Sequence, residues 1–222
     1  MRASVTPRAR ESNAMLALSR AALRRRLVSS ARRPAHSTCA CGLSPCLAPH
    51  CVAGDLGELF QPDSRSLAPY QGTPESVTDA LLSLAGMQPG ESFVDLGAGD
   101  ARVLLAAVQR FGAGSAVGYE LDSVVYKLAL HHIEARLAES PELRARVRVH
   151  CCDARTAQLA GAHVVGMYLL PEGHAALEPH LARELPVGCG TRVVAHGWPI
   201  PGWTAHETLV TTMGTRLYLY RR

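Results

Sequence analysis

The stretch from Ser92 to Arg110, SFVDLGAGDARVLLAAVQR, decides the fold. Apolar residues at positions 93, 94 and 96 predict a buried strand, and apolar residues at 103, 104, 107 and 108 recur at helical spacing. Gly97 and Gly99 form a tight turn between the two elements. A strand that leads through a glycine turn into a helix is typical of a nucleotide-type cofactor site, because backbone N–H groups point at the ligand there. Asp95 adds a carboxylate to the same crevice.

Strand and helix patterns alternate along the rest of the folded region. This alternation predicts an α/β fold with a doubly wound, mostly parallel seven-stranded sheet. A closing hairpin predicts that the C-terminal strand is antiparallel. The expected strands are 92–96, 115–121, 146–152, 162–170, 191–196, 209–212 and 217–220, and the expected helices begin at Thr73-Pro74, after Gly99, at 123 and at 175.

The N-terminal region has the composition of an organellar targeting sequence. Residues 1–33 contain nine arginines and one acid. We therefore predict a transit peptide over 1–38, a linker over 39–68 and one folded domain over 69–222. A mitochondrial location is favoured, with a plastid or the cytoplasm as alternatives. No apolar run approaches the ~20 residues that span a bilayer.

The charge distribution argues against a nucleic-acid partner, and the cysteine spacing argues against a bound metal. Beyond residue 33 the chain has 14 basic and 18 acidic residues, without the basic stripe of a nucleic-acid-binding protein. Cys39, Cys41, Cys46 and Cys51 are spaced C-x-C-x4-C-x4-C, which is not a common zinc-ligand pattern. We therefore expect neither a nucleic-acid partner nor a metal.

Two cofactors compete for the glycine turn. A dinucleotide fingerprint needs G-x-G-x-x-G, but its third glycine is replaced by Arg102. Asp95 and Asp100 would repel a pyrophosphate, whereas a cofactor that carries an ammonium group would be attracted. An NAD-dependent oxidoreductase stays an alternative at this point.

Four short motifs resemble those of class I S-adenosylmethionine-dependent methyltransferases. They are FVDLGAGD (93–100), GYELD (118–122), HCCDA (150–154) and VVGMYLLP (164–171). Within the class, APYQGTPESV (68–77), VGYELD and HGWPIPGW (196–203) are most similar to the lysine methyltransferases of the mitochondrial adenine nucleotide translocase and the ATP synthase c-subunit. The family's usual glycine is Ala101 here.

The resemblance implies S-adenosylmethionine as cofactor, a protein lysine as acceptor and no dedicated catalytic base. A small-molecule methyltransferase is the alternative within the class. The backbone of the glycine turn would pass the amino-acid part of the cofactor, Asp95 would bind its ammonium, Glu120 its ribose, and Asp153 its adenine. The cofactor residues implied are Tyr70, Thr73, Pro74, Asp95, Gly97, Ala98, Gly99, Asp100, Glu120, Leu121, Asp153 and Ala154. The acceptor residues implied are Tyr168, Leu170, Pro171, Trp198 and Trp203.

Overall fold

The structure, a computed structural model, describes residues 66–222. The predicted transit peptide (1–38), the predicted linker up to residue 65 and the four cysteines at 39, 41, 46 and 51 lie outside the described residues, so they stay predictions. Within 66–222, no helix is long and apolar enough to cross a membrane.

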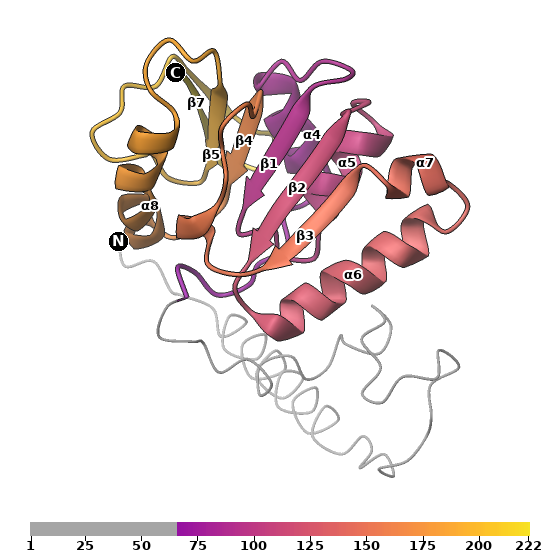
Figure 1. Ribbon diagram of the computed structural model, residues 1–222. Coiled ribbons are helices and arrows are strands. Elements are labelled where there is room, and N and C mark those ends of the chain that lie inside the picture. The colour runs from indigo at the N-terminus through magenta and orange to yellow at the C-terminus, as the bar shows by residue number, and fades with distance from the viewer. Residues whose placement is uncertain (1–65) are drawn as a thin grey trace, which may run out of the picture. The chain divides into compact units, whose positions relative to one another are not determined.

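The described chain forms a seven-stranded sheet in the order β3-β2-β1-β4-β5-β7-β6 (Figure 1). The first five strands in this order are parallel, and β7 runs antiparallel to both β5 and β6. This confirms the predicted sheet. The strands are β1 (Ser92–Leu96), β2 (Ser115–Glu120), β3 (Val147–Cys151), β4 (Val164–Met167), β5 (Arg192–His196), β6 (Glu207–Val210) and β7 (Arg216–Arg221).

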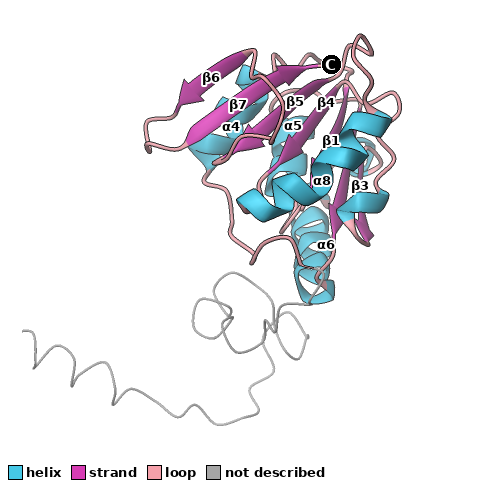
Figure 2. Cartoon of the chain, turned by 90° about the vertical axis from the view of Figure 1, so that its left-hand side faces the viewer, coloured by secondary structure: helices cyan, strands magenta, loops and turns pink. Residues whose placement is uncertain are grey.

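Helices cover both faces of the sheet (Figure 2). Alternate residues of a strand point to opposite faces, so Phe93 packs in the core under α4, α5 and α6, while its neighbour Val94 packs in the core under α8. The helices are α4 (Glu75–Leu84), α5 (Arg102–Gln109), α6 (Ser123–Leu137), the short α7 (Pro141–Arg144), a 3-10 turn η2 (Ala154–Thr156) and α8 (Pro171–Glu184).

Two helix starts differ from the expectation. Thr73 was expected to cap α4, but the helix begins after Pro74 without a side-chain cap. Thr73 is instead buried, and its carbonyl oxygen accepts a hydrogen bond from Arg102 at 3.0 Å. Pro171 was expected at a strand end, but it opens α8, where its missing N–H leaves no helical hydrogen bond unmade.

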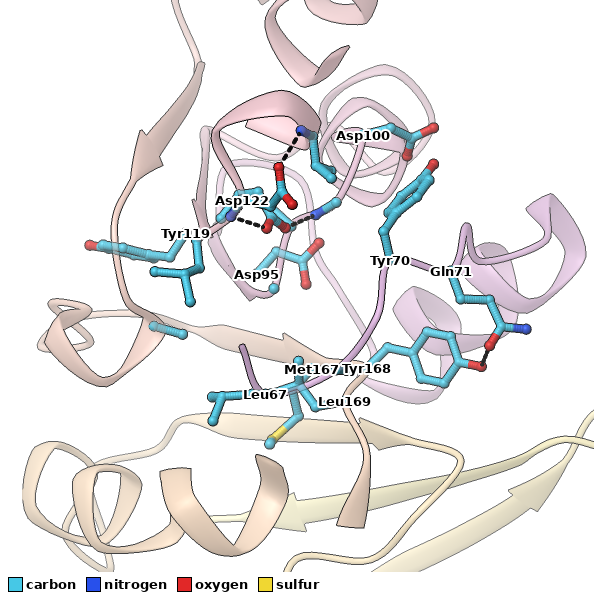
Figure 3. A pocket seen from close by; sticks show the side chains of 18 of the residues that line it. Leu67, Tyr70, Gln71, Asp95, Asp100, Tyr119, Asp122, Met167, Tyr168 and Leu169 are labelled. Carbon is cyan, nitrogen blue, oxygen red and sulfur yellow. Dashed lines mark hydrogen bonds between the residues drawn. The ribbon is translucent and has the colours of Figure 1, made fainter. Parts of the chain in front are cut away.

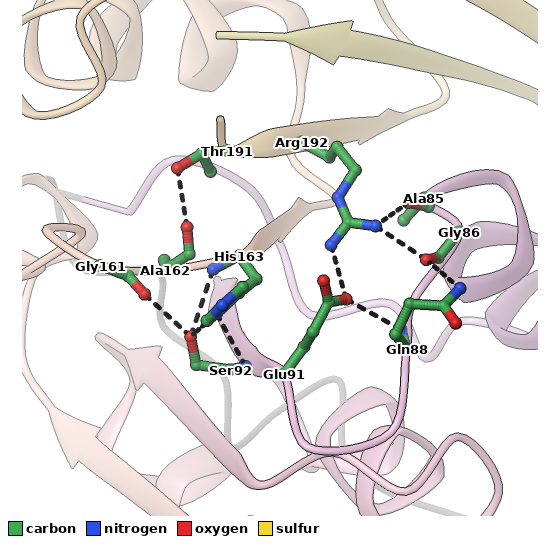
Figure 4. Close-up of polar contacts among 10 residues, drawn as sticks. All are labelled: Ala85, Gly86, Gln88, Glu91, Ser92, Gly161, Ala162, His163, Thr191 and Arg192. Atoms are coloured by element: carbon green, nitrogen blue, oxygen red, sulfur yellow. Dashed lines mark hydrogen bonds and ion pairs between the residues drawn. The ribbon is translucent and has the colours of Figure 1, made fainter. Parts of the chain in front are cut away.

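Polar contacts tie the strands together at the amino edge of the parallel sheet (Figure 4). Arg192 at the start of β5 forms a largely buried ion pair with Glu91 at 2.5 Å and donates to the carbonyl oxygen of Gly86 at 2.7 Å. Ser92 of β1 and His163, which precedes β4, are joined by a 2.8 Å contact between Oγ and Nδ1. These contacts hold the end of α4 and three strands in register, far from the carboxyl edge.

Candidate functional site

A cavity of about 470 Å³ opens at the carboxyl ends of β1, β2 and β4 (Figure 3). Open α/β sheets bind ligands at this edge, and a volume of this size holds a small organic molecule. Eleven of the twelve residues predicted for the cofactor line the cavity, and Pro74 does not. The eleven are Tyr70, Thr73, Asp95, Gly97, Ala98, Gly99, Asp100, Glu120, Leu121, Asp153 and Ala154.

The glycine turn brings backbone close to the cavity, and several of its N–H groups bond within the protein. Gly97 and Gly99 have φ angles of +87° and +55°, which favour glycine. A Cβ on Gly97 would lie 2.9 Å from Leu169. The N–H groups of Gly97 and Ala98 donate to the Tyr119 carbonyl oxygen, at 2.9 and 3.0 Å. These two N–H groups bond within the protein and are not available to a pyrophosphate, while the expected contact of the turn's backbone with the ligand stays a prediction.

Glu120, at the end of β2, is held by the backbone on both of its oxygens. Oε2 accepts from the N–H of Gly99 and Oε1 from that of Asp122, each at 2.9 Å. Burial raises the pKa of this carboxyl, although the two hydrogen bonds act in the opposite direction. Each carboxylate oxygen can accept more than one hydrogen bond, so a pair of neighbouring hydroxyls on a ligand suits this side chain.

Asp95, at the end of β1, is a buried acid without a cationic partner in the described part of the chain. It is 5% exposed and forms no ion pair there. Burial, with the nearby charges of Glu120 and Asp100, raises the pKa of its carboxyl well above the ordinary value. A ligand ammonium would relieve this unfavourable field. A ligand that carries both a cation and a pair of neighbouring hydroxyls suits these two side chains, and S-adenosylmethionine has both.

Comparison with known proteins agrees with this chemistry. The family described as "ANTKMT methyltransferase domain" matches residues 95–207. The chain belongs to this methyltransferase family. A protein-lysine N-methyltransferase of Saccharolobus islandicus is 32% identical to it over 155 residues, which are 68% of this chain and 92% of the relative. The adenine nucleotide translocase lysine N-methyltransferase of Mus musculus is 37% identical over 150 residues, which are 65% of this chain and 62% of the relative.

A solved structure links the methyltransferase to its cofactor class. The RNA methyltransferase from Salinibacter ruber, crystallised with S-adenosyl-L-homocysteine, has a TM-score of 0.60 and is 30% identical. The match covers 68% of this chain and 93% of that one. The protein is therefore an S-adenosylmethionine-dependent methyltransferase with a Rossmann-like fold. The oxidoreductase alternative is excluded.

Asp100 lines the cavity of the methyltransferase, but its carboxylate is bound by the protein itself. Arg102 donates to both of its oxygens, with Nη2 to Oδ2 at 2.6 Å, and Nδ1 of His132 lies 3.3 Å from Oδ2. Despite burial, these partners hold the pKa of Asp100 well below its usual range. Arg102 also reaches the hydroxyl of Tyr70 at 3.5 Å and the carbonyl of Thr73. We infer that Asp100 anchors residues 66–74, the segment before α4 that lies over the cavity and is called the covering loop below.

Asp153 and Ala154 follow β3 and line the cavity. The Asp153 carboxylate accepts from the backbone N–H of Arg155 at 2.9 Å and from its guanidinium at 3.0 Å. These contacts fix the carboxylate at the cavity wall. Its proposed bond to adenine stays a prediction.

Of the five predicted acceptor residues, only Tyr168 lines the cavity. Its hydroxyl donates to Oε1 of Gln71 at 3.0 Å, which joins the end of β4 to the covering loop (Figure 3). Burial, with the charge of Asp100, raises the pKa of Tyr70 in the same loop to about 12. The covering loop therefore makes polar contacts with Arg102 of α5 and with Tyr168.

The other four predicted acceptor residues lie outside the cavity wall. Leu170 and Trp198 are large apolar side chains with 43% and 46% exposure, and Pro171 begins α8. Trp203 instead packs under the Arg222 guanidinium, 3.9 Å from the ring centre. Its indole N–H also donates to Glu178 of α8 at 2.9 Å.

The cavity wall also contains residues that the sequence did not single out. Tyr119 and Met167 directly precede the predicted Glu120 and Tyr168, so motif position could have found them. Nothing in the sequence marked the segment before Pro69. The added wall residues include Ser66, Leu67, Ala68, Gln71, Arg102, Tyr119, Asp122, Val125, Met167 and Leu169.

Proposed function

We propose that this methyltransferase transfers methyl groups from S-adenosylmethionine to a lysine side chain of a protein. The observation that carries the proposal is that two relatives, at 32% and 37% identity, are both named for lysine N-methylation. The alternative acceptors are a small molecule and an RNA, the latter because of the relative from Salinibacter ruber. The excess of acidic over basic residues beyond residue 33 favours a cationic acceptor over RNA.

The cavity supplies what such a reaction needs from the protein. S-adenosylmethionine supplies a methyl group on a positively charged sulfur. When bound, it would give this methyl group to the lone pair of a neutral amine, and the electron pair of the broken C–S bond would stay on sulfur. We propose that Asp95 binds the ammonium of the cofactor and that Glu120 binds its ribose hydroxyls. Fixed geometry of this kind can supply roughly 7–11 kcal/mol of the barrier, and we assign no catalytic base.

The acceptor lysine must lose its proton before transfer. The end of the cavity at Tyr168 is aromatic, and desolvation lowers the pKa of an amine. We propose that the acceptor enters past Tyr168, with Leu170 and Trp198 exposed beside this entrance. Trp203 and Pro171 are assigned to packing and to the start of α8.

We further propose that the protein acts in mitochondria. The arginine-rich composition of residues 1–38 supports this location, as does the name of the mouse relative. Full-length protein fused at its C-terminus to a fluorescent protein should co-localise with a mitochondrial marker, whereas the same fusion lacking residues 1–38 should not. Cytoplasmic signal from the full-length fusion would contradict the location and leave the activity open.

The acceptor class can be tested with full-length protein and tritiated S-adenosylmethionine in a mitochondrial extract. We expect label in material that is degraded by protease and resistant to ribonuclease, and acid hydrolysis should release methylated lysine. Label that ribonuclease removes, or that appears only in small molecules, would contradict the lysine acceptor.

A further inference from the structure

The carboxyl ends of β4 and β5 carry a stacked aromatic pair that motif reasoning did not identify. The two strands are parallel, and their register pairs Met167 with Ala195. The next residues, Tyr168 and His196, therefore stand side by side. Their ring centroids are 3.7 Å apart and their planes differ by 28°. Tyr168 lines the cavity, whereas His196 lies behind it and is only 2% exposed.

Packing alone does not account for a histidine at this position. Nδ1 of His196 is fully buried and has no hydrogen-bond partner within residues 66–222. An unsatisfied buried polar atom costs about 1–3 kcal/mol. Core stability therefore does not explain this side chain, and the feature that can act on the site is the aromatic ring stacked on Tyr168.

The electrostatic state of His196 suits a cationic acceptor. Burial lowers the pKa of His196 to about 4, and the nearby His174 of α8 acts in the same direction. The ring is therefore neutral at physiological pH. Tyr168, which follows β4, stacks on this ring, and His174 of α8 lies close enough to act on its charge; no carboxylate in the described part pairs with it. A neutral ring behind Tyr168 leaves the π face of the phenol attractive to an incoming ammonium.

We propose that His196 is a positioning residue for methyl transfer, which holds the ring of Tyr168 at the place where the acceptor amine enters the cavity. The Gln71 amide fixes the hydroxyl end of the same ring at 3.0 Å, so the phenol is held at its face and at its edge. The inference rests on the proposed lysine acceptor. It adds to the functional site a residue, His196, that does not line the cofactor cavity.

Three variants of the full-length protein test this role. His196→Ala removes the stacking partner and His196→Phe keeps it, while His163→Ala is the matched control, a histidine at the amino edge of the same sheet. Cofactor affinity is measured by isothermal titration with S-adenosylmethionine. Methyl transfer is measured as kcat and apparent KM with mitochondrial extract protein as the acceptor, and folding is checked by thermal unfolding.

We expect His196→Ala to lower kcat about 10- to 100-fold, because a misplacement of about 1 Å can have an effect of this size. Its cofactor affinity should stay within about twofold, since His196 does not line the cavity. His196→Phe should recover most of the rate, and His163→Ala should match the wild type. Retention of the wild-type rate by His196→Ala would overturn the inference.

Two further outcomes would also overturn it. The first is an equal loss of kcat in His196→Phe, because stacking would then not matter. The second is a loss of cofactor affinity in His196→Ala that parallels its loss of kcat. Failure of the proposed function gives a different result from failure of this inference. If the lysine acceptor is wrong, the wild type itself will bind S-adenosylmethionine but leave protein lysines unlabelled.

Discussion

Asp95→Asn should make the protein more stable and at the same time weaken its binding of the cofactor. The change keeps the size of the side chain and removes its charge. In the ligand-free protein the Asp95 carboxylate faces Glu120 and Asp100 and has no cation beside it within the described residues. Removal of that charge should therefore remove an electrostatic repulsion and stabilise the folded state.

The sign of the pH dependence follows from the raised pKa of Asp95. The unfolded chain releases this proton near pH 3.9, whereas the folded chain retains it to a higher pH. Between the two values the folded state binds more protons, so stability falls as pH rises. The asparagine variant lacks this fall. The difference in free energy of unfolding between this variant and the wild type should be smallest near pH 4. It should grow until the pH passes the pKa of Asp95 in the folded protein.

The size of the stabilisation follows from the difference between the folded and unfolded pKa values of Asp95. Each unit between the folded and unfolded pKa is worth about 1.4 kcal/mol. For a domain of this size, that free energy corresponds to roughly 3–6 °C in Tm per unit. Loss of a buried charge partner should weaken cofactor binding by about 2–5 kcal/mol, or roughly 30- to 5,000-fold.

Differential scanning fluorimetry from pH 4 to pH 8, without ligand, measures the first effect, and isothermal titration with S-adenosylmethionine at pH 8 measures the second. Asp79→Asn is the matched control, because Asp79 is a surface acid paired with Arg110. A lower Tm for Asp95→Asn than for the wild type at pH 8 would refute the electrostatic reasoning. Unchanged cofactor affinity would refute the assignment of Asp95 to the ammonium.

Three further substitutions test the glycine turn and its support. Gly97→Arg should abolish cofactor binding in titration while circular dichroism stays native, and Gly188→Arg, also at positive φ but in open space, should bind normally. Ala101→Gly should raise Tm by about 1–4 °C, because Ala101 has φ +67° and the left-handed conformation costs a residue with a Cβ about 1–2 kcal/mol, partly offset in the unfolded chain. Arg102→Met should lower Tm at pH 7 and progressively less as pH falls below about 4, because Asp100, whose folded pKa is depressed, stabilises the fold only while ionised. A pH-independent loss in this last variant would mean that Arg102 acts by packing alone.

The fold could be predicted because its signals are local. The period of the apolar residues changes from strand to helix beside the glycine turn, and the same alternation repeats along the chain. Site residues that adjoin a strand end, such as Asp95 and Glu120, follow from this topology, because parallel strands end at one edge. All but one of the residues predicted for the cofactor line the cavity.

Other features depend on contacts between distant segments and carry no local signal. Trp203 lies in a loop that sequence alone places near the acceptor, yet Arg222 and Glu178 hold it elsewhere. The carboxylate of Asp100 is in the expected place, but its pairing with His132 depends on the packing of α6 beside it. Ser66 to Ala68 join the cavity wall only because the chain folds back over it.

The contacts between Arg192 and Glu91 and between Ser92 and His163 bear on how this protein can change over evolution. They join the strands at the amino edge, and none of their residues lines the cavity at the carboxyl edge. Substitutions around the acceptor entrance can therefore accumulate without loosening the scaffold. A fold fastened in this way can acquire new acceptors by changing loops alone.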